Sequence, residues 1–129
     1  MAERSKDWLK QAERDLEHAK MDLKEGYYEW ACFSAQQAAE KALKALYQSL
    51  GKIAWGHSIL GLLDGLKDEF NVENLINCAK VLDKYYIPTR YPNGFPSGSP
   101  SDYFTEKDAK EAIENASKII RFCKDNIPE

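Results

Sequence analysis

The chain has 129 residues, of which 43% are hydrophobic and 30% are charged, and its formal net charge is −3. This length suits about one domain with a hydrophobic core of its own, so we expect a single domain over residues 1–129. The near balance of charge excludes a strongly basic protein that coats nucleic acid, and no apolar run approaches the roughly 20 residues that cross a bilayer, so no membrane partner is expected.

Two long helices are predicted in the first 50 residues. From Leu9 to Leu23, apolar residues recur at steps of three and four, and Gly26 provides a stop. The second helix runs from about Tyr28 to Leu50 and carries two adjacent apolar stripes, one of which consists of five alanines. Small side chains let a neighbouring helix approach closely, so we expect this helix at the centre of a bundle. Its polar stripe is predicted to be solvated and consists of Gln37, Lys41, Lys44 and Gln48.

Two shorter helices are predicted next. Ser58 can cap a helix over residues 59–66, in which four leucine or isoleucine side chains share one face. Asn71 can cap a further helix that continues to about residue 86.

A loop and a final helix complete the pattern. Four of the five prolines fall between positions 88 and 100, and because proline at this spacing is incompatible with a helix, residues 88 to about 104 are predicted to form a loop. Thr105 and Asp108 form a capping-box variant that starts the last helix. No segment alternates as a half-buried strand does. We therefore predict an all-α fold, a compact antiparallel up-and-down bundle of about four or five helices.

The cysteines and histidines are too few and too scattered for a metal site. Cys32, Cys78 and Cys123 lie far apart, and the chain has two histidines. An odd number of separated cysteines predicts reduced, buried thiols in a cytoplasmic protein rather than a disulfide framework. We expect no metal and no cofactor.

The segment around Arg90 is the strongest candidate for a binding site. Lys84, Tyr85, Arg90 and Tyr91 combine basic groups with aromatic rings in a chain that is acidic overall. The arginine fork matches phosphate, and a tyrosine ring offers a surface on which a base can stack. The alternative is structural: the tyrosines end a helix at the edge of the core, and Arg90 pins the loop to the bundle. The residues leave both interpretations open.

His57 is a second candidate, as an acid or base. It precedes the predicted cap Ser58, so its imidazole would stand near a helix N-terminus, where the charged form is disfavoured. The alternative is that His57 only orders the start of that helix.

Several segments resemble HEPN domains. The resemblance rests on Gln36–Leu46 in the second helix and on Trp8–Leu16 in the first. His57-Ser58-Ile59 is similar to the start of the family's third helix, and Arg90-Tyr91-Pro92 is similar to its Arg-Tyr-Pro element. These segments extend over nearly the whole chain in the expected order.

The resemblance implies a compact helical bundle, commonly a homodimer, in bacterial or archaeal cytoplasm. Many such proteins are encoded beside a minimal nucleotidyltransferase and pair with it, and the family is associated with nucleotide or RNA binding. Its active members are metal-independent ribonucleases whose arginine is followed, after about four to six residues, by a histidine. Arg90 matches that arginine, but positions 95 to 97 are Phe95, Pro96 and Ser97, and no histidine follows. The acid or base of that reaction therefore has no counterpart in the motif.

These features support three hypotheses. The first is a non-catalytic or degenerate HEPN protein, a homodimer that is the nucleotide- or RNA-associated partner of a minimal nucleotidyltransferase in a toxin–antitoxin-like pair. Its ligand surface would consist of Lys84, Tyr85, Arg90 and Tyr91. The second is a metal-independent ribonuclease toxin in which Arg90 acts with His57 in place of the missing histidine. The third is a protein-interaction bundle without nucleotide affinity. The missing histidine favours a protein that is not an enzyme.

Overall fold

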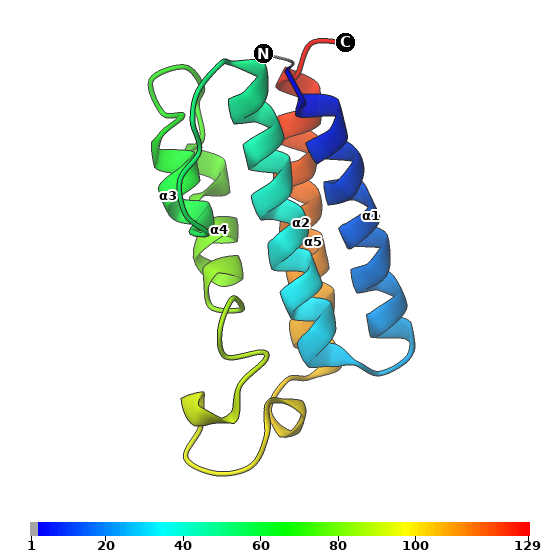
Figure 1. The fold of residues 1–129 in the computed structure, drawn as a ribbon. Coiled ribbons are helices and arrows are strands. Elements are labelled where there is room, and N and C mark those ends of the chain that lie inside the picture. Colours follow the sequence, from blue (N-terminus) through cyan, green and yellow to red (C-terminus); the bar gives the residue numbers. More distant parts are fainter. Residues whose placement is uncertain (1–2) are drawn as a thin grey trace.

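The computed structural model describes residues 3–129, so the first two residues of the predicted domain lie outside the described residues. Residues 3–129 form five α-helices and no β-strand, which confirms the predicted all-α bundle (Figure 1). The helices are α1 (Ser5–Lys24), α2 (Tyr28–Ser49), α3 (Ile59–Asp64), α4 (Ile76–Asp83) and α5 (Glu106–Asn126).

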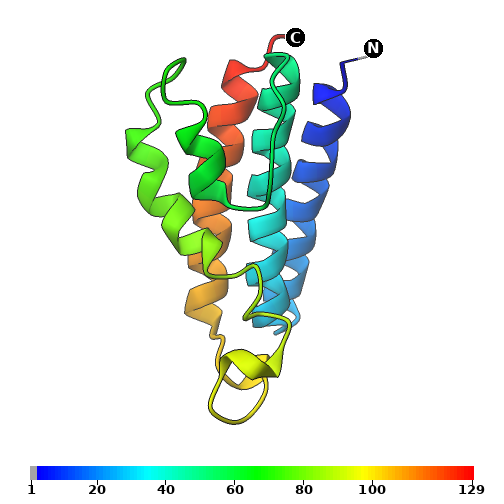
Figure 2. The same ribbon diagram turned by 60° about the vertical axis from the view of Figure 1, so that its left-hand side comes forward.

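Along the chain, α1, α2, α4 and α5 alternate in direction, as the helices of an up-and-down bundle do (Figures 1 and 2). α1 runs opposite to α2, and α3 runs opposite to α4 as one side of a short hairpin, whereas α2 and α5 run in the same direction (Figures 1 and 2). The turn between α1 and α2 contains Gly26, whose φ of 83° is a left-handed conformation that glycine adopts without a steric penalty.

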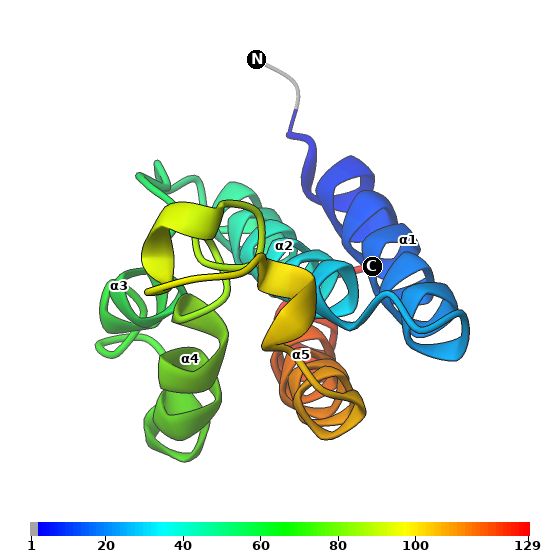
Figure 3. The same cartoon turned by 90° about the horizontal axis from the view of Figure 1, so that it is seen from below.

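α2 is the central helix, as predicted. It lies between α1 and the α3–α4 hairpin, and α5 packs against it (Figure 3). The predicted small-residue stripe is fully buried and consists of Ala31, Ala35, Ala38, Ala42 and Ala45. Because alanine projects so little beyond the backbone, neighbouring helices come close to α2 along this stripe.

The polar stripe on α2 is less solvated than predicted. All four of its residues are partly buried: Gln37, Lys41, Lys44 and Gln48. The reason is that the N-terminal segment and α1 run along this side of α2 and supply polar partners there. Lys41 Nζ lies 2.5 Å from a carboxylate oxygen of Asp15 in α1, and the backbone N–H of Arg4 donates to Gln48 Oε1 over 3.3 Å.

Of the two helix caps predicted in the α3–α4 hairpin, Ser58 is confirmed and Asn71 is wrong. The Ser58 hydroxyl oxygen accepts from the backbone N–H of Gly61 at 3.0 Å, as an N-cap does. The side chain of Asn71 accepts from the N–H of Glu73 at 3.2 Å. This local turn leads into a 3₁₀ turn, η1 (Glu73–Leu75), so α4 begins only at Ile76 and ends at Asp83.

The segment between α4 and α5 contains two 3₁₀ turns and no α-helix. The turns are η2 (Pro92–Gly94) and η3 (Pro100–Asp102), and the segment closes one end of the bundle (Figure 2). Phe95 stacks on Tyr103 with ring centroids 4.2 Å apart, so the segment packs on itself. The predicted capping box then starts α5: Thr105 N–H donates to the Asp108 carboxylate at 3.0 Å, and Asp108 N–H donates to Thr105 Oγ1 at 3.1 Å.

Candidate functional site

Two segments that are far apart in the sequence meet beside α2. The first is the start of α3 and the second is the end of α4. The carboxylate of Asp83 joins them, because it accepts from the Ser58 hydroxyl at 2.9 Å and from the backbone N–H groups of Ile59 and Leu60 at 2.6 and 3.1 Å. The consequence is that His57, which precedes Ser58, lies next to the residues that follow α4.

Arg90 is held at the centre of an aromatic cluster. Its Nε and Nη2 both donate to the backbone carbonyl of Tyr86, at 2.9 and 2.6 Å. Its Cζ lies 4.4 Å from the ring centroid of Phe33, 5.0 Å from that of Tyr86 and 5.2 Å from that of Tyr91. A cation over a ring face is attracted by the ring quadrupole. These contacts support the interpretation that Arg90 pins the loop to the bundle.

The pinning role leaves part of the guanidinium available. A guanidinium carries more N–H donors than one carbonyl can accept, and within residues 3–129 no group accepts from Nη1. Arg90 is only partly buried, and the neighbouring Tyr91 ring is 48% exposed. The two interpretations of Arg90 left open by the sequence are therefore compatible with each other.

His57 lies against the same cluster. Its ring stacks on Tyr86 with centroids 4.6 Å apart and planes 17° apart. Its Nδ1 lies 3.2 and 3.1 Å from the two carboxylate oxygens of Glu40, and its side chain is 54% exposed. His57 directly precedes the N-cap Ser58 of α3; the Asp83 carboxylate accepts from the first N–H groups of that helix, and the Glu40 carboxylate faces the His57 ring.

Glu40 is a buried carboxylate with a full set of donors. It is 4% exposed, and besides His57 it accepts from Lys44 Nζ at 3.0 Å and from Gln36 Nε2 at 3.2 Å. The same Gln36 nitrogen donates to the backbone carbonyl of His57 at 3.1 Å. A buried charge is tolerated when it is paired and hydrogen-bonded in this way. The network therefore fixes both the position and the orientation of the His57 ring.

The remaining residues of the predicted ligand surface differ in their surroundings. Lys84 is exposed, and within residues 3–129 it forms no ion pair. Tyr85 packs its ring edge-on against Phe104, 5.8 Å away, and lies against the core. Burial raises the pKa of the Tyr85 phenol above its ordinary value. Tyr85 therefore packs toward the core, whereas Lys84 and Tyr91 are exposed and Arg90 is partly buried.

Sequence reasoning missed the contribution of α2 to this site. Phe33 and Glu40 both face the cluster, and Trp30 extends it, since the Trp30 and Phe33 rings meet edge to face at 6.2 Å. The available signal was the pair Gln36 and Glu40, two polar residues one helical turn apart on the otherwise apolar side of α2. Polar groups at core positions require partners, which were not visible in the sequence.

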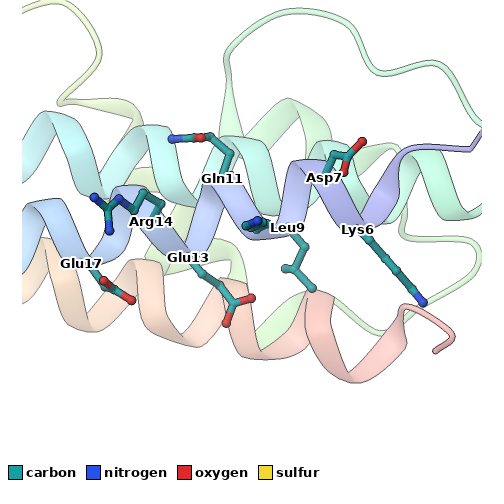
Figure 4. Close-up of a pocket in the computed structure, with 8 residues that line it drawn as sticks. Lys6, Asp7, Leu9, Gln11, Glu13, Arg14 and Glu17 are labelled. Atoms are coloured by element: carbon teal, nitrogen blue, oxygen red, sulfur yellow. The ribbon is translucent and has the colours of Figure 1, made fainter.

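A concave surface lies away from this cluster, on α1. A groove of about 710 Å³ runs along the outer side of α1, where Lys6, Glu13, Arg14 and Glu17 present charges of both signs around Leu9 (Figure 4). Glu13 is engaged by Lys124 of α5 at 3.2 Å. None of the groove's lining residues belongs to the Arg90 cluster.

Residues 3–129 contain neither a cluster of metal ligands nor a membrane-spanning helix. No group of three or more histidine, cysteine, aspartate or glutamate side chains converges as metal ligands would. No helix in this part of the chain is long and apolar enough to cross a bilayer.

Comparisons with known proteins agree with the architecture. The HEPN domain family matches residues 5–126. The crystal structure of TT1696 from Thermus thermophilus superposes with a TM-score of 0.94 at 51% identity, covering 97% of this chain and 99% of that chain. The crystal structure of ST0689, an archaeal HEPN homologue, gives 0.84 at 46% identity, covering 98% and 100%. The "Putative toxin MJ1304" of Methanocaldococcus jannaschii is 30% identical over an alignment of 135 positions, which covers 97% of this chain and 89% of that protein.

Proposed function

The chain belongs to the HEPN domain family, and on this premise we propose that it is a non-catalytic nucleotide- or RNA-binding protein of a toxin–antitoxin-like pair. In this proposal it is a cytoplasmic homodimer that associates with a minimal nucleotidyltransferase. The similarity to a protein named as a toxin supports the pair. The nucleotidyltransferase and the homodimer rest on what the family resemblance implies.

The observation that carries the binding proposal is the setting of Arg90. A guanidinium fixed between aromatic rings, with N–H groups left over, combines a phosphate donor with surfaces on which bases stack. Its position is set in advance by the Tyr86 carbonyl, so little side-chain entropy is lost on binding. We assign Arg90 and Lys84 to phosphate groups and Tyr91 to a stacked base, with Tyr85 supporting them from the core.

The non-catalytic part of the proposal rests on the missing histidine. Residues 91–129 contain no histidine, so the family's acid or base is absent after Arg90. In addition, the Nε side of the Arg90 fork is occupied by the Tyr86 carbonyl. Both observations favour a protein that retains a ligand and does not cleave it.

One observation favours a second candidate, a metal-independent ribonuclease. His57 is oriented by the buried Glu40 carboxylate in the manner of the carboxylate–histidine pairs of hydrolytic enzymes, and it shares the Tyr86 ring with Arg90. In that candidate His57 replaces the missing motif histidine.

A titration of the wild type with a short single-stranded RNA and with a mononucleotide tests the proposal. We expect binding that weakens at higher salt with a shallow slope, since few basic residues take part. Arg90→Ala should weaken binding by about 1.5–3 kcal/mol, roughly 10–150-fold, the range for hydrogen bonds to charged groups. Arg121→Ala is the matched control, because this exposed arginine on α5 lies outside the cluster.

The same samples separate the candidates. Light scattering should give the mass of a dimer, and RNA incubated with the protein without metal should stay intact. Cleavage that both Arg90→Ala and His57→Ala abolish would establish the second candidate instead. If no ligand binds while Arg90→Ala only lowers the melting temperature, the domain is an interaction bundle and Arg90 is a structural residue.

A further inference from the structure

We infer that His57 is a second phosphate-binding group of the Arg90 site, and that it binds the phosphodiester backbone of single-stranded RNA only when its imidazole is protonated. This inference rests on the proposed function, because it adds a contact to the same ligand surface. The pair of His57 and the buried Glu40, stacked on Tyr86 beside Arg90, carries it.

Glu40 determines which nitrogen of His57 faces the ligand. An ionised carboxylate only accepts hydrogen bonds, so the nitrogen that lies against it must carry a proton. That nitrogen is Nδ1, 3.1 Å from Glu40 Oε2. The other nitrogen, Nε2, is therefore the one left to face a ligand. With the side chain 54% exposed, a ligand can reach the ring.

Tyr86 contacts both His57 and Arg90, so the two groups lie within about 10 Å of each other. Its ring stacks on the His57 ring at 4.6 Å and lies 5.0 Å from Arg90 Cζ, while its backbone carbonyl fixes the arginine fork. A ligand that extends along the Tyr86 ring meets both cationic groups. Adjacent phosphates of a single strand suit such a pair of donors, with a base stacked on the exposed Tyr91 ring.

The charged groups around His57 determine how much positive charge its protonation adds to the site. On α2 the negative charge of Glu40 is already offset by Lys44, whose Nζ lies 3.0 Å from the carboxylate. On α4 the Asp83 carboxylate is occupied by Ser58 and by two backbone N–H groups. On the segment after α4, the Tyr86 ring stacks on His57, and the cation of Arg90 lies over that same ring. A proton on His57 therefore adds positive charge that no unpaired carboxylate at the site cancels.

The sign of the pH dependence follows from this arrangement. Imidazoles exchange their proton between about pH 5 and 8. In acid, Nε2–H donates to a phosphate oxygen, whereas at higher pH the Nε2 lone pair faces that anionic oxygen and repels it. Affinity for the RNA should fall about tenfold between pH 5.5 and 8, which corresponds to the lower end of the range for a hydrogen bond between charged groups.

The test uses a short single-stranded RNA, because its phosphodiesters do not titrate in this range, unlike the terminal phosphate of a mononucleotide. Titrations are run from pH 5.5 to 8 with the wild type, His57→Gln and His18→Gln. His18 is the matched control, since it is the other histidine and lies on α1 against Asp22. We expect the wild type and His18→Gln to lose affinity alike with rising pH, and His57→Gln to bind with a constant, weaker affinity.

A second measurement gives a result on the wild type that does not depend on whether His57→Gln folds. Calorimetry in two buffers of different ionisation enthalpy, near pH 7, should show that the wild type and His18→Gln take up part of a proton when RNA binds. His57→Gln, at unchanged helical content, should take up none. Binding without proton uptake in the wild type, or a pH dependence that His57→Gln retains, would overturn the inference and leave the proposed function standing. The absence of RNA binding at every pH would overturn both.

Discussion

Asp83 should stabilise the protein more than its position at the end of a short helix suggests. Its carboxylate accepts three hydrogen bonds from the start of α3: one from the Ser58 hydroxyl and two from the N–H groups of Ile59 and Leu60. A bond to a charged group contributes about 1.5–3 kcal/mol when it is buried. Ser58 is exposed, and water can replace part of what is lost. We therefore expect Asp83→Ala to lower the free energy of unfolding by about 2–3 kcal/mol rather than by the sum.

The expected change is large enough to measure by thermal and urea unfolding, followed by circular dichroism. For a chain of this length it corresponds to a fall in melting temperature of roughly 6–12 °C. Asp83→Asn keeps one acceptor oxygen and should cost about half as much. Asp68→Ala is the matched control, because Asp68 is exposed between α3 and α4. Amide exchange should also become faster at Ile59 and Leu60. An Asp83→Ala melting temperature within about 2 °C of the control would refute the account of how the two segments are joined.

Two further predictions use the buried ionisable groups. Burial raises the pKa of Tyr85, so the folded protein keeps this phenol protonated at a pH where the unfolded chain loses the proton, and the free energy of unfolding should fall as the pH rises above about 10. In urea titrations between pH 8 and 11, Tyr85→Phe should lose less stability than the wild type or the control Tyr27→Phe. Equal losses in all three proteins would contradict this prediction. Burial also raises the pKa of Cys32 to about 12 and that of Cys123 still further. A thiol reagent at pH 8 should therefore label these two cysteines at least about 100-fold more slowly in the native protein than in the urea-unfolded chain, and rapid labelling of either one in the folded protein would show that it is accessible.

The helices themselves were predictable because their signals act over a few residues. The spacing of the alanines predicted that α2 lies at the centre of the bundle. The start of α5 was predictable because the reciprocal hydrogen bonds of Thr105 and Asp108 connect positions only three residues apart. Asn71 shows where such local reasoning fails. Its side chain reaches the N–H of Glu73 and makes a turn, because asparagine serves a turn and a helix cap equally well.

The candidate site was only half predictable. Arg90, Tyr91 and His57 stood out by residue type, and the resemblance drew attention to the same positions. What the sequence could not show is that Glu40 of α2 faces His57, or that Tyr86 lies between His57 and Arg90. These contacts join residues from different elements, so they depend on how the α3–α4 hairpin packs against α2.

The amino-acid pattern was enough to predict the all-α class, most of the helix boundaries and the burial of the cysteines, because periodicity and capping are properties of neighbouring residues. The tertiary structure decided which polar residues have partners. Lys41 of α2 forms an ion pair with Asp15 of α1, and Asp83 accepts a hydrogen bond from Ile59, which lies 24 residues earlier in the chain. Only packing brings such groups within hydrogen-bond distance, and burial then makes a partner necessary, since a buried charge without one is too costly to keep.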